Sequence, residues 1–323
     1  MTRHLNGPLI TGLGAAILTA FVLPMVLGGQ WTGIFTSTAC FAMAAMGAGF
    51  MYSRLGMVSL AQVALMGVGG WVTLRLNHAF SLPFEANLIL AAIGTSVLGM
   101  LLAIPALRMR GLYLALVTLM VAGGLEVVFT AYQFPNGGAG FWGVGTSFAA
   151  EMRRPVLAQS DAAYLTYTLI VAVLGLLLIM AHRQTAPGRA WALIRRSEAA
   201  AIASGTNVTF YKAWAFGLSG LLAGLGGGLL AGSLGLLDAA SFRASESILL
   251  FALVIVGGAR FWLGAVIAAI LYRVAPGLLN NWGVDADLAL IFFGAALLHA
   301  VMTAPDGIAG QIIGLFHRKE GKA

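Results

Sequence analysis

Charged residues are scarce in this chain of 323 residues: only 9% are charged, against roughly 25% in ordinary soluble domains. Hydrophobic residues make up 60% of the sequence, and the mean hydropathy is +0.92. The apolar residues come in long blocks, which suit lipid, and not in the alternating patterns of a water-bounded core. The composition therefore excludes a water-soluble globule and predicts one membrane domain over residues 1–323.

The residues that several other kinds of functional site require are missing from the sequence. The single cysteine, Cys40, excludes an intrachain disulfide framework and a cysteine-built zinc site. The five histidines are dispersed and none pairs at His-x-x-x-His spacing, so we expect no bound metal. No Gly-x-x-x-x-Gly-Lys-Ser/Thr motif is present to hold ATP phosphates. The net charge of +7 is scattered between apolar blocks and forms no basic stripe, which argues against nucleic-acid binding.

Ten apolar blocks predict an all-α polytopic membrane protein, because a backbone in lipid has no hydrogen-bond partners outside its own helix. The block at 247–258 is short for a hydrocarbon core of about 30 Å. It and its successor could form a broken or re-entrant pair, so the expected number of transmembrane helices is eight to ten. The blocks cover residues 9–27, 32–51, 57–74, 88–107, 112–131, 164–181, 213–236, 247–258, 262–279 and 288–303.

Lys and Arg residues predict the orientation. With ten spans, most of them lie on the same side as the N-terminus, and the positive-inside rule makes that side cytoplasmic. Both termini are then cytoplasmic. An outer loop at about 132–163 is rich in glycine and aromatic residues, as either a surface cap or a docking site would be. An inner loop covers about 182–212.

The inner loop contains an alanine-rich stretch that predicts one short cytoplasmic helix, ending at the glycine C-cap Gly205. Apolar anchors alternate there with charged residues. A helix laid into the groove of a partner protein has this composition, and so does a helix lying on anionic lipid. The residue chemistry leaves both possibilities open.

Short motifs follow one another along nearly the whole chain. They include Gly56-Met57-Val58-Ser59-Leu60-Ala61-Gln62, Gly111-Leu112-Tyr113, Ile194-Arg195-Arg196-Ser197-Glu198-Ala199-Ala200, Gly205-Thr206-Asn207-Val208, Val256-Gly257-Gly258 and Pro305-Asp306-Gly307. In order and spacing they resemble the permease subunits of ATP-binding-cassette importers, specifically the branched-chain amino acid (LivM-type) permease family. Two departures, Ala259-Arg260-Phe261-Trp262 after the paired glycines and Asn136 before Gly137-Gly138, bear on solute identity and not on fold.

The resemblance implies a permease fold in the bacterial inner membrane and a transporter subunit that is not itself an enzyme. It implies a second permease subunit, expected to be a distinct homologue, two ATPase subunits that bind ATP and Mg, and an external solute-binding protein. The chain itself would bind no cofactor, and the solute would be a branched-chain or related amino acid. The segment 188–205 would receive the ATPase stroke through Arg189, Ile194, Arg195, Arg196, Glu198, Ile202 and Gly205.

Glycines and polar residues within the apolar blocks suggest how helices pack and where solute passes. A glycine cluster at 67–70 predicts a broken helix whose free N-terminus would meet a solute carboxylate. Glu126 and Arg273 lie within spans, where a charge is costly unless it faces protein or water. Glu126 is expected to line the pathway or to form a structural hydrogen bond between helices. The other expected lining residues are Ser59, Gln62 and Thr118, and the expected packing ridge is Gly220, Gly224, Gly228 and Gly232.

Two further functions fit some of the same features. An ion-coupled secondary transporter also uses broken helices and intramembrane acids. The stretch Gly217-Leu218-Ser219-Gly220 resembles the serine motif of rhomboid-type intramembrane proteases, with His299 in another span as the base. The protease hypothesis leaves the basic inner loop unexplained.

Overall fold

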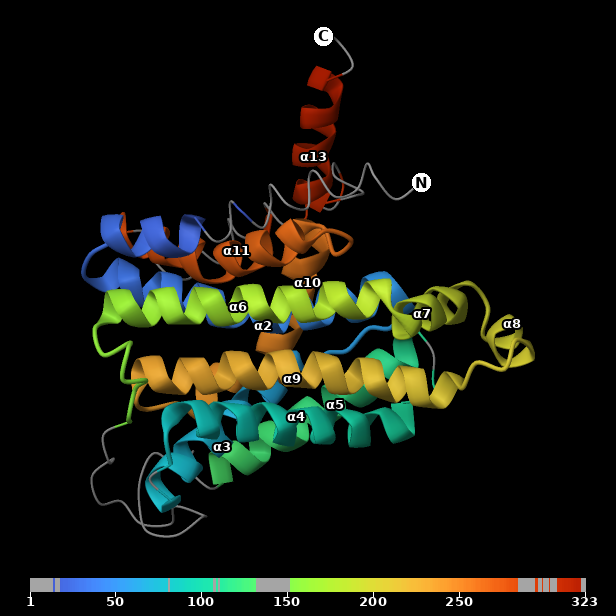
Figure 1. The fold of residues 1–323 in the computed structure, drawn as a ribbon, viewed down its shortest axis with the longest axis horizontal. Coiled ribbons are helices and arrows are strands. Elements are labelled where there is room, and N and C mark those ends of the chain that lie inside the picture. The colour runs from blue at the N-terminus through green and yellow to red at the C-terminus, as the bar shows by residue number, and fades with distance from the viewer. Residues whose placement is uncertain are drawn as a thin grey trace.

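A computed structural model describes residues 18–80, 82–106, 111–131, 152–283 and 307–320, with a few single residues between. Every regular element within these ranges is a helix (Figure 1). In chain order they are α2 (Gln30–Leu55), α3 (Gln62–Phe80), α4 (Phe84–Ala106), α5 (Leu112–Ala131), α6 (Asp161–Gln184), α7 (Ala186–Arg196), α8 (Glu198–Ala203), α9 (Val208–Leu234), the 3-10 helix η1 (Ala239–Phe242), α10 (Ala244–Gly257), α11 (Trp262–Asn281) and α13 (Gly307–Glu320).

The chain is a polytopic α-helical membrane protein. Among the described residues, α2, α4, α5, α6, α9 and α11 are long and apolar enough to cross a membrane. The helices α3 and α10 occupy two more of the predicted blocks, and α10 is short, as its sequence indicated. Part of the first predicted block and most of the last lie outside the described residues, so a total of ten crossings stays a prediction.

Helix α9 forms the centre of the bundle and packs against α2, α3 and α4 (Figure 1). Its glycines allow backbones to approach closely. A Cβ added at Gly224 would lie 1.8 Å from the Thr95 hydroxyl of α4, and one at Gly227 would lie 1.8 Å from the Met66 carbonyl oxygen of α3. The four glycines of the expected ridge all meet neighbours too closely for a Cβ: Gly220, Gly224, Gly228 and Gly232.

The predicted helix break at 67–70 is wrong in position. Helix α3 runs without interruption from Gln62 to Phe80, and its glycines serve close packing. A Cβ at Gly69, for example, would lie 2.5 Å from the Cα of Gly224. The interruption lies earlier, at 56–61, where Gly56 ends α2 with a φ of +67° that disfavours other residues.

The inner loop forms two helices where the sequence predicted one. Helix α7 ends at Arg196 and α8 begins at Glu198, with Ser197 in an extended conformation between them. The Ser197 hydroxyl accepts a hydrogen bond from the Ala200 backbone N–H at 3.2 Å, so the serine caps a new helix. Gly205 follows α8 with a φ of +78°, the conformation expected of a glycine beyond a helix end.

Candidate functional site

The start of α3 is a buried helix N-terminus in the middle of the bundle. Irregular backbone is tolerated at membrane depth only where protein or a cavity satisfies its polar groups. Here side chains from two other helices do so. The Leu60 N–H donates to the Thr118 hydroxyl of α5 at 2.9 Å, and the Val63 N–H donates to the Ser247 hydroxyl of α10 at 3.2 Å. Three separate segments therefore meet at this point.

Gln62 extends this buried polar group toward α9. Its amide Nε2 donates to the Ser219 hydroxyl at 2.7 Å, near the middle of α9. The Gln62 side chain is only 2% exposed, and its Oε1 has no partner among the described residues. An unpaired buried acceptor costs about 1–3 kcal/mol, so this oxygen is available to a donor that enters the site. Ser59, in the irregular segment, is also buried.

Two charged residues at membrane depth have protein partners. The Glu126 carboxylate accepts a hydrogen bond from the Ala244 N–H at 2.9 Å, at the N-terminus of α10, where negative charge is favoured. This is the structural bond between helices that was one of its two expected roles. Arg273 donates through Nε to the Ser37 hydroxyl at 2.8 Å, and its guanidinium lies over the Phe41 ring.

A second site is the α7–α8 segment, at the end of the bundle where α6 ends and α9 begins (Figure 1). One face of α7 packs into the body of the protein. Trp191 is fully buried, donates its indole N–H to the Tyr211 carbonyl at 2.8 Å and meets the Phe50 ring edge-on. Helix α8 is tied to α9 by an ion pair between Glu198 and Lys212, with Nζ and Oε1 2.5 Å apart.

The residues expected at the ATPase interface separate into two groups. Ile194 is only 4% exposed and packs into the chain's own core, so its side chain does not lie on the outer face. Glu198 is half-buried by its ion pair with Lys212. Ile202 is 64% exposed. The other exposed members of the set are Arg189, Arg195, Arg196 and Gly205.

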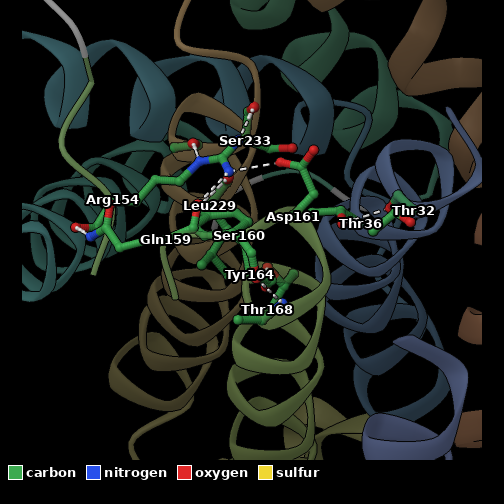
Figure 2. Close-up of polar contacts among 12 residues, drawn as sticks. Thr32, Thr36, Arg154, Gln159, Ser160, Asp161, Tyr164, Thr168, Leu229 and Ser233 are labelled. Carbon is green, nitrogen blue, oxygen red and sulfur yellow. Dashed lines mark hydrogen bonds and ion pairs between the residues drawn. The ribbon is translucent and has the colours of Figure 1, made fainter. Parts of the chain in front are cut away.

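Sequence reasoning missed a clamp at the opposite end of α9, formed by Arg154 (Figure 2). Its Nε donates to the Gly232 carbonyl and its Nη2 to the Ser233 carbonyl, both at 3.1 Å. Its Nη1 contacts the Asp161 carboxylate at 2.7 Å, at the start of α6. A cation is favoured at a helix C-terminus. No sequence motif marks this role, because the acceptors are backbone carbonyls. Of the expected outer loop at 132–163, residues 132–151 lie outside the described part of the chain.

The surroundings of Ser219 do not support the protease hypothesis. The Ser219 side chain is fully buried and its hydroxyl is hydrogen-bonded to Gln62. His299 lies outside the described residues. Within the described part of the chain, no group of three or more His, Cys, Asp or Glu residues is placed to hold a metal ion.

Comparison with known proteins identifies the family. The family model for the permease component of branched-chain amino acid transport systems matches residues 30–301. The chain is 25% identical over 335 residues to LivM, the high-affinity branched-chain amino acid transport system permease protein of Salmonella typhimurium, covering 96% of this chain and 77% of the relative. It is 25% identical over 320 residues to the protein of the same name from Escherichia coli K12, with 92% and 74% covered.

No solved structure shows a significant match. The family match covers most of the chain and agrees with its polytopic helical architecture. Members of this family are transport components without a catalytic site or cofactor of their own. The chain belongs to the family of permease components of branched-chain amino acid transport systems.

Proposed function

We propose that this chain and a second permease subunit form the membrane pathway of an importer for branched-chain or related amino acids. An external binding protein delivers the solute, and two ATPase subunits dock on the α7–α8 segment. The observation that carries the proposal is an exposed, charged α7–α8 segment with one face anchored in the body of a chain of this family. Both termini and α7–α8 then lie in the cytoplasm, and ten helices cross the membrane.

The way in which α7–α8 is anchored would let it transmit a movement of the ATPase to the bundle, and we call this segment the lever. Its outer face carries Arg196 and Ile202, which a partner can contact. Arg195 is also exposed, but its Nη1 donates to the Tyr52 carbonyl of α2 at 3.5 Å. Its inner connections lead to α9, through Trp191 to the Tyr211 carbonyl and through Glu198 to Lys212. A displacement of α8 therefore acts directly on the first turns of the helix at the centre of the bundle. Ile194 would position α7 against the body and would not contact the ATPase.

The N-terminus of α3 is suited to bind the carboxylate group of an amino acid. A helix N-terminus attracts a carboxylate, because its N–H groups and dipole present positive charge. In this structure the Ser247 hydroxyl accepts from the Val63 N–H in the first turn of α3, and the Thr118 hydroxyl accepts from the Leu60 N–H just before the helix. A passing amino acid would take these bonds over with its carboxylate and donate from its ammonium group to the free Oε1 of Gln62. In this arrangement the site would be closed to the solute, with the buried Ser59 in the irregular segment before α3.

Reconstitution tests the proposal. Proteoliposomes containing this chain, its partner permease and the ATPases should accumulate labelled leucine when the binding protein and ATP are supplied. The matched control replaces the ATPases with hydrolysis-deficient variants, and uptake should cease. Uptake by this chain alone under a proton or sodium gradient would show a secondary transporter and defeat the proposal.

A further inference from the structure

A cleft lies between α6 and α11, which both pack on α2. Its walls are apolar and include Phe50 of α2, Ile179 and Met180 of α6, and Trp262 of α11. All three helices are long and apolar enough to cross a membrane, so lipid would lie against this part of the bundle. Its polar end is formed by Arg54, Arg183 and Arg260.

Arg54 and Arg183 bring two positive charges together at this end of the cleft. Arg54 lies at the end of α2 and Arg183 at the end of α6, and the charges of Arg183 and Arg195 both act on Arg54. Within the described part of the chain, neither the Arg54 nor the Arg183 side chain has a hydrogen bond or ion pair. Arg260 has an interaction of its own, so the inference rests on the other two.

We infer that this cleft binds the headgroup phosphate of an anionic phospholipid, such as phosphatidylglycerol, with the acyl chains along its apolar walls. Neighbouring like charges repel unless an anion lies between them. Guanidinium groups bind phosphate oxygens in pairs, and basic pockets between membrane helices are suited to acidic headgroups. The location between α6 and α11 favours lipid over the acidic surface of an ATPase, which would meet the exposed α7–α8 segment first.

A bound lipid would stabilise the joint between the membrane body and the lever. Arg183 precedes α7 by only three residues, and Arg54 lies on the helix that supplies Phe50 against Trp191. The headgroup would bridge the ends of α2 and α6 immediately below α7. The lipid would thereby hold the base of α7 in a fixed position.

The test measures phosphatidylglycerol retained by the complete purified transporter, using native mass spectrometry after incorporation into phosphatidylcholine nanodiscs with and without phosphatidylglycerol. The wild type should retain it. The double variant Arg54→Gln, Arg183→Gln should retain it at least about fivefold less, as expected for loss of a basic residue near acidic lipid. Arg243→Gln, which removes an exposed arginine between η1 and α10, is the matched control and should retain lipid as the wild type does.

Two outcomes would overturn the inference. The double variant could retain as much phosphatidylglycerol as the wild type. It could also lose its ATPase subunits while keeping the lipid, which would show that the arginines bind protein. Should the double variant fail to fold, Arg183→Gln alone supplies the same measurement, because that side chain is exposed and makes no bond within the described part of the chain.

Discussion

The two ends of the proposed mechanism are built differently. Helix α9 is enclosed by α2, α3 and α4, and its glycines bring backbones into direct contact. The α7–α8 segment touches the body with one face and exposes the other. Packing as close as that around α9 tolerates little local change, whereas a one-sided segment can shift by exchanging a few contacts. We therefore expect α9 to keep its position in the bundle and the α7–α8 segment to be the part that moves.

Enlarging a central glycine should have the largest effect. Gly227→Leu places a side chain where the Met66 carbonyl oxygen of α3 lies, and neither backbone can withdraw without separating the helices. We expect a loss of stability of at least about 3 kcal/mol, seen as the disappearance of the folded peak in size-exclusion chromatography. The control is Gly123→Leu in α5, where an added Cβ meets nothing within 4 Å. Equal yields of both variants would contradict close packing at the centre.

Reversing the charge at the lever should spare folding and reduce transport. Glu198→Lys replaces an attraction to Lys212 with a repulsion and leaves that lysine, whose side chain is 4% exposed, without its carboxylate. Because the Glu198 side chain is 22% exposed, the cost is smaller than the about 3–5 kcal/mol of a fully buried pair and falls on the docking of α8 against α9. We expect uptake and ATPase assembly to fall by about tenfold or more, with normal membrane insertion.

The swapped pair, Glu198→Lys with Lys212→Glu, is the control for that prediction. It restores opposite charges at the same two positions and should recover a substantial part of the uptake. Unchanged uptake in Glu198→Lys alone would remove α8 from the mechanism.

Hydropathy was sufficient to predict helices at eight of the blocks, because apolar blocks in lipid have no alternative to helical hydrogen bonding. It could not locate the start of α3. Residues 57–61 are as apolar as a helix, and the hydroxyls that accept from the Leu60 and Val63 N–H groups belong to Thr118 and Ser247, which are distant in sequence. The buried face of α7 could have been found, since Ala190, Trp191 and Ile194 recur at helical spacing.

The clamp at the far end of α9 should contribute less than the lever. Arg154→Gln removes the guanidinium that binds the Gly232 and Ser233 carbonyls and the Asp161 carboxylate. Hydrogen bonds to charged groups are worth about 1.5–3 kcal/mol, so we expect a lower unfolding temperature with uptake largely kept. Arg154→Lys, which keeps the positive charge but not the branched guanidinium group, should give an intermediate unfolding temperature. Identical unfolding temperatures for all three proteins would show that the clamp is not stabilising.

The smallest effect is expected at the start of α3. Thr118→Val keeps the shape of the side chain but removes the acceptor of the Leu60 N–H, at a cost of about 1 kcal/mol. We also expect a raised KM for solute, because without the Thr118 hydroxyl the backbone at Leu60 would no longer be held in place at the proposed carboxylate site. The control is Thr130→Val, whose hydroxyl bonds, among the described residues, to the Glu126 carbonyl of its own helix. A KM changed equally by both variants would count against a solute site at this position.

Thiol labelling tests the docking of the ATPase on α7–α8 most directly. The chain's single cysteine, Cys40, is fully buried, so a cysteine introduced at the exposed Ile202 is the accessible thiol. We predict that bound ATPase subunits protect Ile202→Cys from a maleimide reagent, while Leu236→Cys, exposed beyond the far end of α9, reacts as before. Equal labelling of Ile202→Cys with and without the ATPases would contradict the account.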